Sequence, residues 1–357
     1  MSRWVLANFS KNWGGGEKWT LTTAQALQQS GHHAHLIVYP GSHLAVQAAQ
    51  LGLPCLSIKA CAFSLFNPLK VLTLFRCFQS NSFDAVILNA SHELKFIGLI
   101  AKFASIPRII FRRGIPQPLQ AHVINRWYLK YVVNCVIVNS KATLLAMESV
   151  FSHELSRLPV QVIYNGLDLQ LWKSDYDKQD SSIIGVVGRL SYEKGIDRAL
   201  YVFAQVNKKL PATQLWIVGQ GEEQENLEKI ATELGILDCS RFTGFTENVR
   251  QYMQKMDILL FPSRWEGFGY VLLEAMSLEV PPVAFDIGAA KEIITEDTGV
   301  LVPDGEITAC ANEVINLLQD RPLRKQMGKN ARCHVKEKFS LFRVVEQLEK
   351  LLLISES

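Results

Sequence analysis

Two glutamates, Glu266 and Glu274, flank a Gly-x-Gly turn in the stretch SRWEGFGYVLLEAM (263–276). The stretch follows the apolar run DILLFP and precedes a helical pattern, which predicts a strand, a loop and then a helix. If the helix begins near Gly269, Glu266 lies in the loop and Glu274 on the second helical turn. The helix N-terminus would offer amides to an anion. We therefore interpret the glutamates as acceptors for hydroxyl groups beside a phosphate site, and not as the facing acid/base pair of a glycosidase.

Two basic side chains, Arg189 and Lys194, lie in the stretch GVVGRLSYEKG (185–195). The apolar start of this stretch predicts a strand, and Gly195 precedes the next helical pattern, so both cations are expected on one strand-to-helix loop. There a guanidinium fork and a mobile ammonium would grip neighbouring phosphate groups. The alternative is an exposed basic pair for which Glu193 is an ordinary surface partner.

A glycine-rich turn lies near the start of the chain, where NFSKNWGGGEKW carries Gly14, Gly15 and Gly16. A strand is predicted before the turn and a helix from about Glu17, so the backbone can approach a ligand closely and present amides to it. This arrangement suits a phosphate or a sugar. Tight packing of the strand against the helix would explain the same glycines.

Short runs rich in Val, Ile and Leu alternate with longer helical patterns along the chain. Near-continuous apolar strands joined by helical crossovers predict parallel sheets covered on both faces, with functional loops at the carboxyl ends of the strands. We therefore expect an α/β fold with a doubly wound sheet in each half. The predicted strands are RWVLANF, HLIVY, AVILNA, RIIF and CVIVNS, then SIIGVVGRL, QLWIVGQG, DILLFPS and PPVAFD, and the predicted helices of the first half include 17–30 and 91–104.

At 357 residues the chain is longer than a single core usually organises, so two domains are expected. The stretch VQVIYNGLDLQLWKSDYDKQD runs from a strand through an Asn-Gly turn signal into polar residues, which predicts a boundary near residue 167. The domains are then 1–167 and 168–339. The last segment has an apolar face at helical spacing, and we expect a helix over about 340–357 that packs near or back onto the first domain.

The chain has no apolar run of about twenty residues that would span a bilayer. Its first residues, MSRWVLANFSKNW, lack the features of a signal peptide. Its seven cysteines are scattered without a Cys-x-x-Cys spacing, which argues against disulfides, zinc and redox chemistry. A cytoplasmic location is therefore expected.

The net charge of +3 is the sum of a basic first half and an acidic second half of the chain. Residues 1–167 carry 15 Lys and Arg against 5 Asp and Glu, whereas residues 168–357 carry 22 against 29. The first half is therefore expected to meet lipid headgroups, a phosphorylated acceptor or nucleic acid, unless its charge only keeps the protein soluble. The segment AFSLFNPLKVLTLFRCFQS (62–80) adds a row of Phe and Leu beside Lys70 and Arg76. It predicts either an interfacial amphipathic helix or a helix packed on the first sheet.

The order of the motifs, from the glycine-rich turn through VIYNGLD, GRLSYEKG, IVGQGEE, FTGFTENV and EGFGYVLLEAM, resembles the retaining glycosyltransferases of family 4. The resemblance covers nearly the whole chain, and its specific part lies in the second half. It implies the GT-B fold of two facing Rossmann-like domains with an interdomain cleft. It also implies that the second domain binds a nucleotide-sugar donor, a UDP-sugar before a GDP- or ADP-sugar. The first domain would bind a glycolipid or oligosaccharide acceptor.

The resemblance assigns roles to individual residues of this chain. Arg189 and Lys194 would neutralise the donor diphosphate, and Glu274 would accept hydrogen bonds from the ribose hydroxyls. Glu266 would hold hydroxyls of the donor sugar. The other donor contacts, to the base, the diphosphate and the sugar, are expected from Gly15, Gly16, Gly244, Phe245, Gly267, Phe268 and Gly269.

The first domain departs from the family pattern at one position. Many relatives carry a His on the loop after the strand that corresponds to PRIIFRRG, where this chain has Arg113. Arg113 would grip an anionic group of the donor or acceptor, unless the alignment is shifted by a residue. His92, in NASHELKF, is a second strand-end candidate that would supply an imidazole, with helix capping or packing as its alternative.

Together with these residues, the resemblance implies a metal-independent, retaining transferase that acts on a lipopolysaccharide or exopolysaccharide precursor, peripherally at the anionic inner membrane and without nucleic acid. Two cations and a helix N-terminus would offset the charge of the leaving group, so no cofactor is required. Asp175 and Asp177 have the spacing of a metal site but lie in the polar interdomain stretch. The rival classes are a non-hydrolysing nucleotide-sugar epimerase and a non-catalytic nucleotide-sugar-binding protein.

Overall fold

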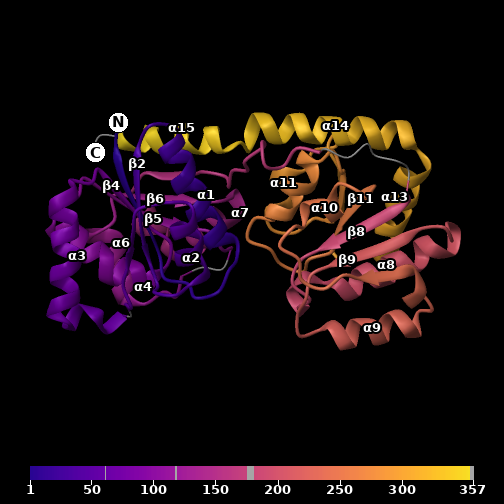
Figure 1. Ribbon diagram of the computed structural model, residues 1–357, viewed down its shortest axis with the longest axis horizontal. Helices are drawn as coiled ribbons and strands as arrows, with labels where there is room; N and C mark the ends of the chain where they lie inside the picture. The colour runs from indigo at the N-terminus through magenta and orange to yellow at the C-terminus, as the bar shows by residue number, and fades with distance from the viewer. Residues whose placement is uncertain (61, 117–118, 175–180, 354–357) are drawn as a thin grey trace. The chain divides into compact units, whose positions relative to one another are not determined.

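A computed structural model of the protein describes residues 1–60, 62–116, 119–174 and 181–353 (Figure 1). The chain forms two compact units. Unit 1 contains residues 1–166 and the segment from Leu341 onward, and unit 2 contains Leu167–Ser340. Among the described residues, no helix has the length and apolar composition needed to cross a bilayer.

Unit 1 is built on a parallel sheet whose described strands follow the order β3-β2-β1-β4-β5-β6-β7. Every residue of β4 and β6 is buried because helices cover both faces, which explains why their sequences are apolar without alternation. The sheet starts at a central strand and winds outward in both directions, as in a Rossmann fold. The strands are β1 (Arg3–Asn8), β2 (His33–Val38), β3 (Cys55–Ser57), β4 (Ala85–Leu88), β5 (Arg108–Arg113), β6 (Cys135–Val138) and β7 (Val160–Val162).

Helices cover the two faces of this sheet in separate layers. On one face, α3, the π-helical turn η2, α5, α6 and α7 pack onto the strands through one hydrophobic core. On the other face, α1 packs against β1 and β2 and is flanked by α2 and α15. The helical segments of unit 1 are α1 (Gly15–Gln29), α2 (His43–Gln50), η1 (Ala62–Phe66), α3 (Pro68–Asn81), α4 (Ser91–Glu93), η2 (Leu94–Gly98), α5 (Leu99–Phe103), α6 (Val123–Tyr131), α7 (Lys141–Leu155) and α15 (Leu341–Leu352).

The predicted terminal helix is present as α15, which belongs to unit 1 although it follows unit 2 in the chain. It packs against α1, and His32 Nε2 lies 2.7 Å from Glu349 Oε1. The chain therefore returns to the first unit after completing the second. The buried face of α15 consists of Val344, Val345, Leu348 and Leu351.

The apolar segment 62–80 forms η1 and most of α3. Leu74 and Phe78 are buried in the core of unit 1, as expected for a helix packed on the sheet. Phe66 and Leu69 remain mostly exposed. The segment therefore has a packed inner side and an apolar outer side.

Unit 2 repeats the architecture with a second parallel sheet, whose described strands follow the order β10-β9-β8-β11-β12-β13. The predicted α/β fold with a parallel sheet in each half is confirmed, and so is each strand named from the sequence. The strands are β8 (Ile183–Val187), β9 (Gln214–Val218), β10 (Ser240–Phe242), β11 (Ile258–Phe261), β12 (Pro282–Phe285) and β13 (Val300–Val302).

The helices of unit 2 connect these strands and cover the sheet, with α8 against α13 and α11 against α14 (Figure 1). The described helical segments are η3 (Tyr192–Lys194), α8 (Ile196–Lys209), α9 (Gln224–Glu233), η4 (Leu237–Cys239), α10 (Arg250–Met253), α11 (Tyr270–Ser277), α12 (Ala290–Ile293), α13 (Ile307–Gln319) and α14 (Arg321–Lys338).

Candidate active site

The two charged motifs of unit 2 follow the adjacent strands β8 and β11. Loop 188–195 after β8 carries Arg189 and Lys194, and loop 262–269 after β11 carries Glu266. Because the carboxyl ends of neighbouring parallel strands lie at one edge of the sheet, the fold brings these loops together.

Gly195 allows the backbones of the two loops to touch. It ends η3 and begins α8 in the left-handed region, with φ of +62°. A Cβ at this position would lie 2.2 Å from the carbonyl oxygen of Pro262. Only glycine meets both conditions without strain. The close approach therefore places the lysine that precedes Gly195 beside the second loop.

Lys194 Nζ forms an ion pair with Glu266 Oε2. The side chains are 26% and 19% exposed, so the pair is neither fully hydrated nor fully enclosed. The other carboxylate oxygen of Glu266 accepts a hydrogen bond from Gly267 N–H at 3.2 Å. Lys194 and Glu266, which were both predicted to bind the donor, are therefore held together by their own ion pair.

Arg189 is exposed on the same loop and adds to the positive charge there. Burial would raise the pKa of Glu193, but hydrogen bonds and the charges of Arg189 and Lys194 outweigh burial, and its pKa lies below its ordinary value. Glu193 is therefore ionised near neutral pH. It balances part of the cationic loop, in agreement with the surface partner that the sequence suggested.

Helix α11 begins at the predicted position. Gly269 is its N-cap in the left-handed region, with φ of +92°, and Glu274 lies on its second turn with a buried side chain. The ring of Phe268 is buried and packs against Tyr270 and Phe339 at centroid distances of 6.2 and 6.1 Å. Phe268 therefore anchors the turn through its ring and has only its main chain to offer to a ligand.

Gly244 and Phe245 follow β10, which is separated from β8 by β9. Gly219 N–H donates to the Gly244 carbonyl at 3.1 Å, which ties this loop to the end of β9. Gly244 has a φ of +72°, with open space where a Cβ would lie, and Phe245 is exposed. The position leaves room for a flat group against the backbone.

An ion pair that the sequence reasoning missed clamps the two charged loops. Arg264 forms a bidentate pair with Asp197, with N–O distances of 2.8 and 2.6 Å. The same guanidinium donates to the Tyr192 carbonyl at 2.9 Å and lies 4.1 Å from the centre of the Tyr192 ring. Its main-chain N–H donates to the Glu193 carbonyl at 2.8 Å. The available signal was the complementary charge of Arg264 and Asp197, which lie in or next to two loops that were both predicted to bind the donor.

The predicted site residues of unit 1 lie at the ends of three adjacent strands, β1, β4 and β5. The turn Gly14-Gly15-Gly16 opens α1 after β1, with Gly14 as the N-cap. His92 follows β4, and Arg113 ends β5. The fold therefore gathers them at one edge of the first sheet, as it gathers the charged loops at one edge of the second.

His92 is partly exposed and stacks on Phe9, with ring centroids 6.0 Å apart. Burial, followed by the charge of Lys95, lowers the pKa of His92, so its imidazole is neutral near neutral pH. The neighbouring Glu93 is buried, and its oxygens accept hydrogen bonds from the N–H groups of Phe9, Asn89 and Ala90 at 2.6–2.9 Å. Glu93, which the sequence reasoning also missed, therefore fastens the loop after β1 to the loop after β4.

The two arginines at the end of β5 have different environments. Arg112 is buried, its guanidinium carbon lies 3.9 Å from the centre of the Trp19 ring, and it donates to Asn89 Oδ1 at 3.0 Å and Asn165 Oδ1 at 2.8 Å. Arg113 is half-buried, and burial lowers its pKa. Arg112 holds strand ends together, which leaves Arg113 as the better placed of the two for a ligand.

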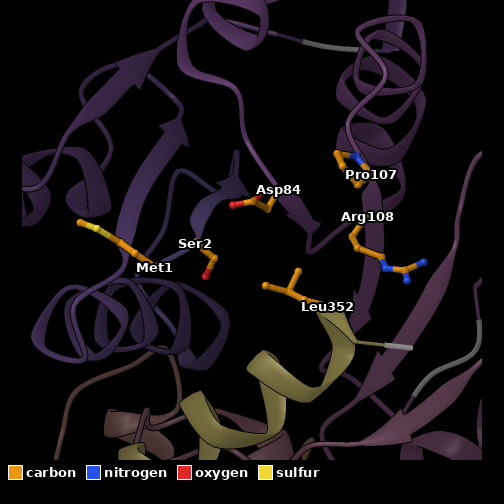
Figure 2. Close-up of a pocket in the computed structure, with 6 residues that line it drawn as sticks. All are labelled: Met1, Ser2, Asp84, Pro107, Arg108 and Leu352. Carbon is orange, nitrogen blue, oxygen red and sulfur yellow. The ribbon is translucent and has the colours of Figure 1, made fainter. Parts of the chain in front are cut away.

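Metal-binding groups and cavities are the remaining candidates for a functional site. Within the described parts of the chain, no group of three or more His, Cys, Asp and Glu is placed to hold a metal ion. Asp175 and Asp177 lie outside the described residues. A cavity of about 380 Å³ in unit 1 is lined by residues that precede β1, β4 and β5, by Arg108 and by the end of α15 (Figure 2). It therefore lies at the amino ends of the strands, opposite to the predicted site residues.

Comparison with known proteins follows the same division of the chain. The family described as "Glycosyltransferase Family 4" matches residues 13–171, and the family described as "Glycosyl transferases group 1" matches residues 170–334. N-acetyl-alpha-D-glucosaminyl L-malate synthase of Bacillus anthracis is 31% identical over 56% of this chain and 55% of its own length. The capsular polysaccharide biosynthesis glycosyltransferase CapM of Staphylococcus aureus is 25% identical over 81% of each chain.

The chain spans about half the length of several of the curated relatives that it matches. Among solved structures, Anabaena HepE in complex with UDP superposes with a TM-score of 0.82 at 22% identity, covering 98% of this chain and 99% of HepE. The two consecutive family matches and this shared architecture confirm the resemblance found in the motifs. The chain belongs to the glycosyltransferases of the GT-B fold, with a family 4 domain in its first half and a group 1 domain in its second.

Proposed function

We propose that the protein is a retaining glycosyltransferase that moves a sugar from a nucleoside-diphosphate sugar to a lipopolysaccharide or exopolysaccharide precursor. One observation carries this proposal: Arg189, Lys194, Glu266 and the N-terminus of α11 gather at the ends of the adjacent strands β8 and β11. That set offers positive charge for a diphosphate and a carboxylate for sugar hydroxyls. Unit 2 would bind the donor, and unit 1 the acceptor.

In this proposal, the donor binds by displacing the ion pair between Lys194 and Glu266. A diphosphate placed between Arg189 and the start of α11 competes for the ammonium of Lys194, which exchanges one anionic partner for another. Glu266 then accepts hydrogen bonds from the donor sugar. After the exchange Lys194 is paired with phosphate and Glu266 is hydrogen-bonded to hydroxyl groups, so neither ion is left without a polar partner in the partly enclosed site.

Transfer breaks the bond between the anomeric carbon and the phosphate oxygen, which keeps the electron pair, and forms a bond from that carbon to an acceptor hydroxyl oxygen, whose proton passes to the departing phosphate. From fixed positions, Arg189, Lys194 and the α11 dipole offset the negative charge of the departing phosphate, and no metal is needed for that step. Glu274 would accept hydrogen bonds from the ribose, and the backbone of Gly244 and Phe245 would contact the base.

In unit 1, Arg113 and His92 would contact the acceptor or the transferring sugar. The half-buried guanidinium of Arg113 suits an anionic group, and the neutral imidazole of His92 suits a hydroxyl. The name of CapM and the UDP-glucose in a second HepE structure support a polysaccharide product and a UDP-sugar donor. A glycolipid or oligosaccharide acceptor would place the protein at the cytoplasmic face of an anionic membrane.

The proposal is tested by incubation with labelled UDP-, GDP- and ADP-sugars in the presence of a lipid-linked oligosaccharide. Transfer of label to the acceptor, with the anomeric configuration of the donor preserved in the NMR spectrum of the product, is the expected result. An epimerised donor would instead identify an epimerase. Donor that binds but stays unchanged with every acceptor would identify a binding protein.

A further inference from the structure

One side of unit 1 exposes large apolar side chains that the transfer reaction does not use. It is the outward side of the layer formed by α3, α5, α6 and α7, and we call it the outer helical face. The inward residues of the same helices form the core of unit 1 against the sheet. The exposed apolar residues of the outer helical face are Phe66, Leu69, Leu72, Phe103, Val123, Ile124, Trp127, Tyr131 and Leu145.

The helices of this face form one continuous layer. Helix α3 packs against α5, and α6 packs against α7. Between them, Tyr128 Oη donates to the Lys95 carbonyl at 2.9 Å, and Lys102 Nζ donates to the Tyr131 carbonyl, so α6 is joined to both ends of the η2–α5 segment. The exposed side chains therefore belong to a single layer, whereas isolated apolar residues on a monomer surface would need no explanation.

The charge of this face is positive. From residue 59 to the end of α7 at Leu155, the chain contains 11 Lys and Arg against four acidic residues, Asp84, Glu93, Glu148 and Glu154. Glu93 is buried, and Asp84 precedes β4, where its carboxylate accepts a hydrogen bond from Arg3 N–H at 2.7 Å. The exposed cations Arg76, Lys102, Lys130 and Lys141 lie among the apolar side chains of this face. Glu154 is paired with Arg126 at 2.8 Å, which leaves Glu148 on α7 as the exposed carboxylate among these four acidic residues.

We propose that the outer helical face docks on an anionic lipid bilayer, with its Phe, Leu and Trp side chains in the interface and its lysines on the headgroups. Apolar side chains interleaved with cations are what such a surface requires, because burial and headgroup attraction each contribute only modestly. This inference deepens the membrane part of the proposed function by naming the docking face. It rests on unit 1 alone, and vesicle binding is measured without donor or acceptor, so its failure leaves the transfer reaction untouched.

The test uses a matched pair of substitutions in the full-length protein. Phe103 on the outer helical face and Phe342 on α15 are each 72% exposed and both belong to unit 1. Co-sedimentation is measured with phosphatidylcholine vesicles and with vesicles that also contain phosphatidylglycerol. We expect binding to the anionic vesicles alone, weakened roughly tenfold by Phe103→Glu and less than about twofold by Phe342→Glu, with unchanged melting temperatures.

Charge is tested on the same face. The double substitution Lys130→Gln and Lys141→Gln should lower the affinity for anionic vesicles, and roughly 0.5 M NaCl should release the wild type, because the screening length there is only about 4 Å. On binding, tryptophan emission should shift to the blue in the wild type and in Trp265→Phe, and much less in Trp127→Phe. Trp265 and Trp127 are similarly exposed, but Trp265 belongs to unit 2.

Three results would overturn the proposal. Equal binding to both kinds of vesicle, or binding to neither, would exclude charge-assisted docking. Equal losses from Phe103→Glu and Phe342→Glu would show that another part of the surface binds. A concentration-dependent dimer in sedimentation that Phe103→Glu abolishes, without vesicle binding, would assign the face to a second copy of the chain.

Discussion

At the scale of single residues, the proposed donor site of unit 2 would depend on charges whose partners change when a donor binds. Arg189 is exposed on its loop and, in the proposed function, would contribute to the charge facing a diphosphate. Arg189→Ala should therefore raise the barrier of transfer by about 2–4 kcal/mol, as for loss of a preorganised electrostatic group, and leave the melting temperature unchanged. Steady-state kinetics with the identified donor measure the effect. Turnover within about twofold of the wild type would remove Arg189 from the mechanism.

Substitutions of Glu274 and Glu266 should affect nucleotide binding and the transfer step separately. Glu274→Gln keeps the volume of the side chain but loses the charge that strengthens hydrogen bonds from ribose, so calorimetry should show weaker UDP binding. Glu266→Gln should bind UDP at least as tightly as the wild type, because glutamine competes less strongly for Lys194, and should chiefly lower kcat, because the partner of Glu266 would be the sugar. If Glu274→Gln binds UDP as tightly as the wild type, the ribose role is wrong.

Glu93 should make stability depend on pH. Burial raises its pKa to about 8, although hydrogen bonds from the N–H groups of Phe9, Asn89 and Ala90 oppose the rise. The folded protein then holds this proton more tightly than the unfolded chain does. Stability from this group is fully present below the ordinary carboxyl pKa and is lost as pH rises toward 8, by up to about 1.4 kcal/mol per pH unit.

The measurement is urea unfolding at a series of pH values for the wild type and Glu93→Gln. Glutamine does not titrate, so the wild type should lose stability relative to the variant between pH 5 and 8. Parallel pH dependences for the two proteins would show that Glu93 has an ordinary pKa.

At the scale of elements, the loops after β8 and β11 act as one unit because Arg264 and Asp197 join them. Burial would raise the pKa of Asp197, but the hydrogen bond and charge of Arg264 outweigh it, and the pKa is lowered. Arg264→Leu removes the bidentate guanidinium partner of the Asp197 carboxylate and should lower the free energy of unfolding by about 1–3 kcal/mol. It should also lower kcat, because Lys194 and Glu266 lose their common support.

Two further variants show whether Arg264 has a positioning role. Arg264→Lys retains a cation and should recover part of the activity. Arg198→Leu removes a comparable ion pair, Arg198 with Asp304 at 2.7 Å, which does not bridge the two loops. It should affect stability more than kcat. Equal losses of kcat from the two leucine substitutions would show that the clamp has no specific effect on the site.

At the scale of the whole molecule, the last helix stabilises the first unit. Leu348 is fully buried on α15, so Leu348→Ala should destabilise unit 1 by about 2–5 kcal/mol. The exposed Phe342 on the same helix provides the control, and Phe342→Ala should change stability by less than about 0.5 kcal/mol. Calorimetry should show a lowered transition for unit 1 and an unchanged one for unit 2. A shift confined to unit 2 would contradict this assignment of α15.

Much of the fold and of the candidate site could be predicted from the sequence. Central strands buried on both faces have near-continuous apolar sequences, so β4, β6, β8 and β11 were evident, and the ends of β8 and β11 located the loops with Arg189, Lys194 and Glu266. The edge strands β3, β10 and β13 were missed because each has three residues and pairs on one side only. Such strands leave no periodic signal in the sequence.

The sequence by itself determined which residue types follow which strands, because local periodicity reports where strands and helices begin and end. The tertiary structure alone decided their partners. Lys194 and Glu266 are 72 positions apart, and Arg264 and Asp197 are 67 apart, so no local pattern pairs them. The same holds for Arg112, which stacks on Trp19 although the two residues lie far apart in the sequence. Side-chain environment depends on packing between distant segments, and only the folded chain brings those segments together.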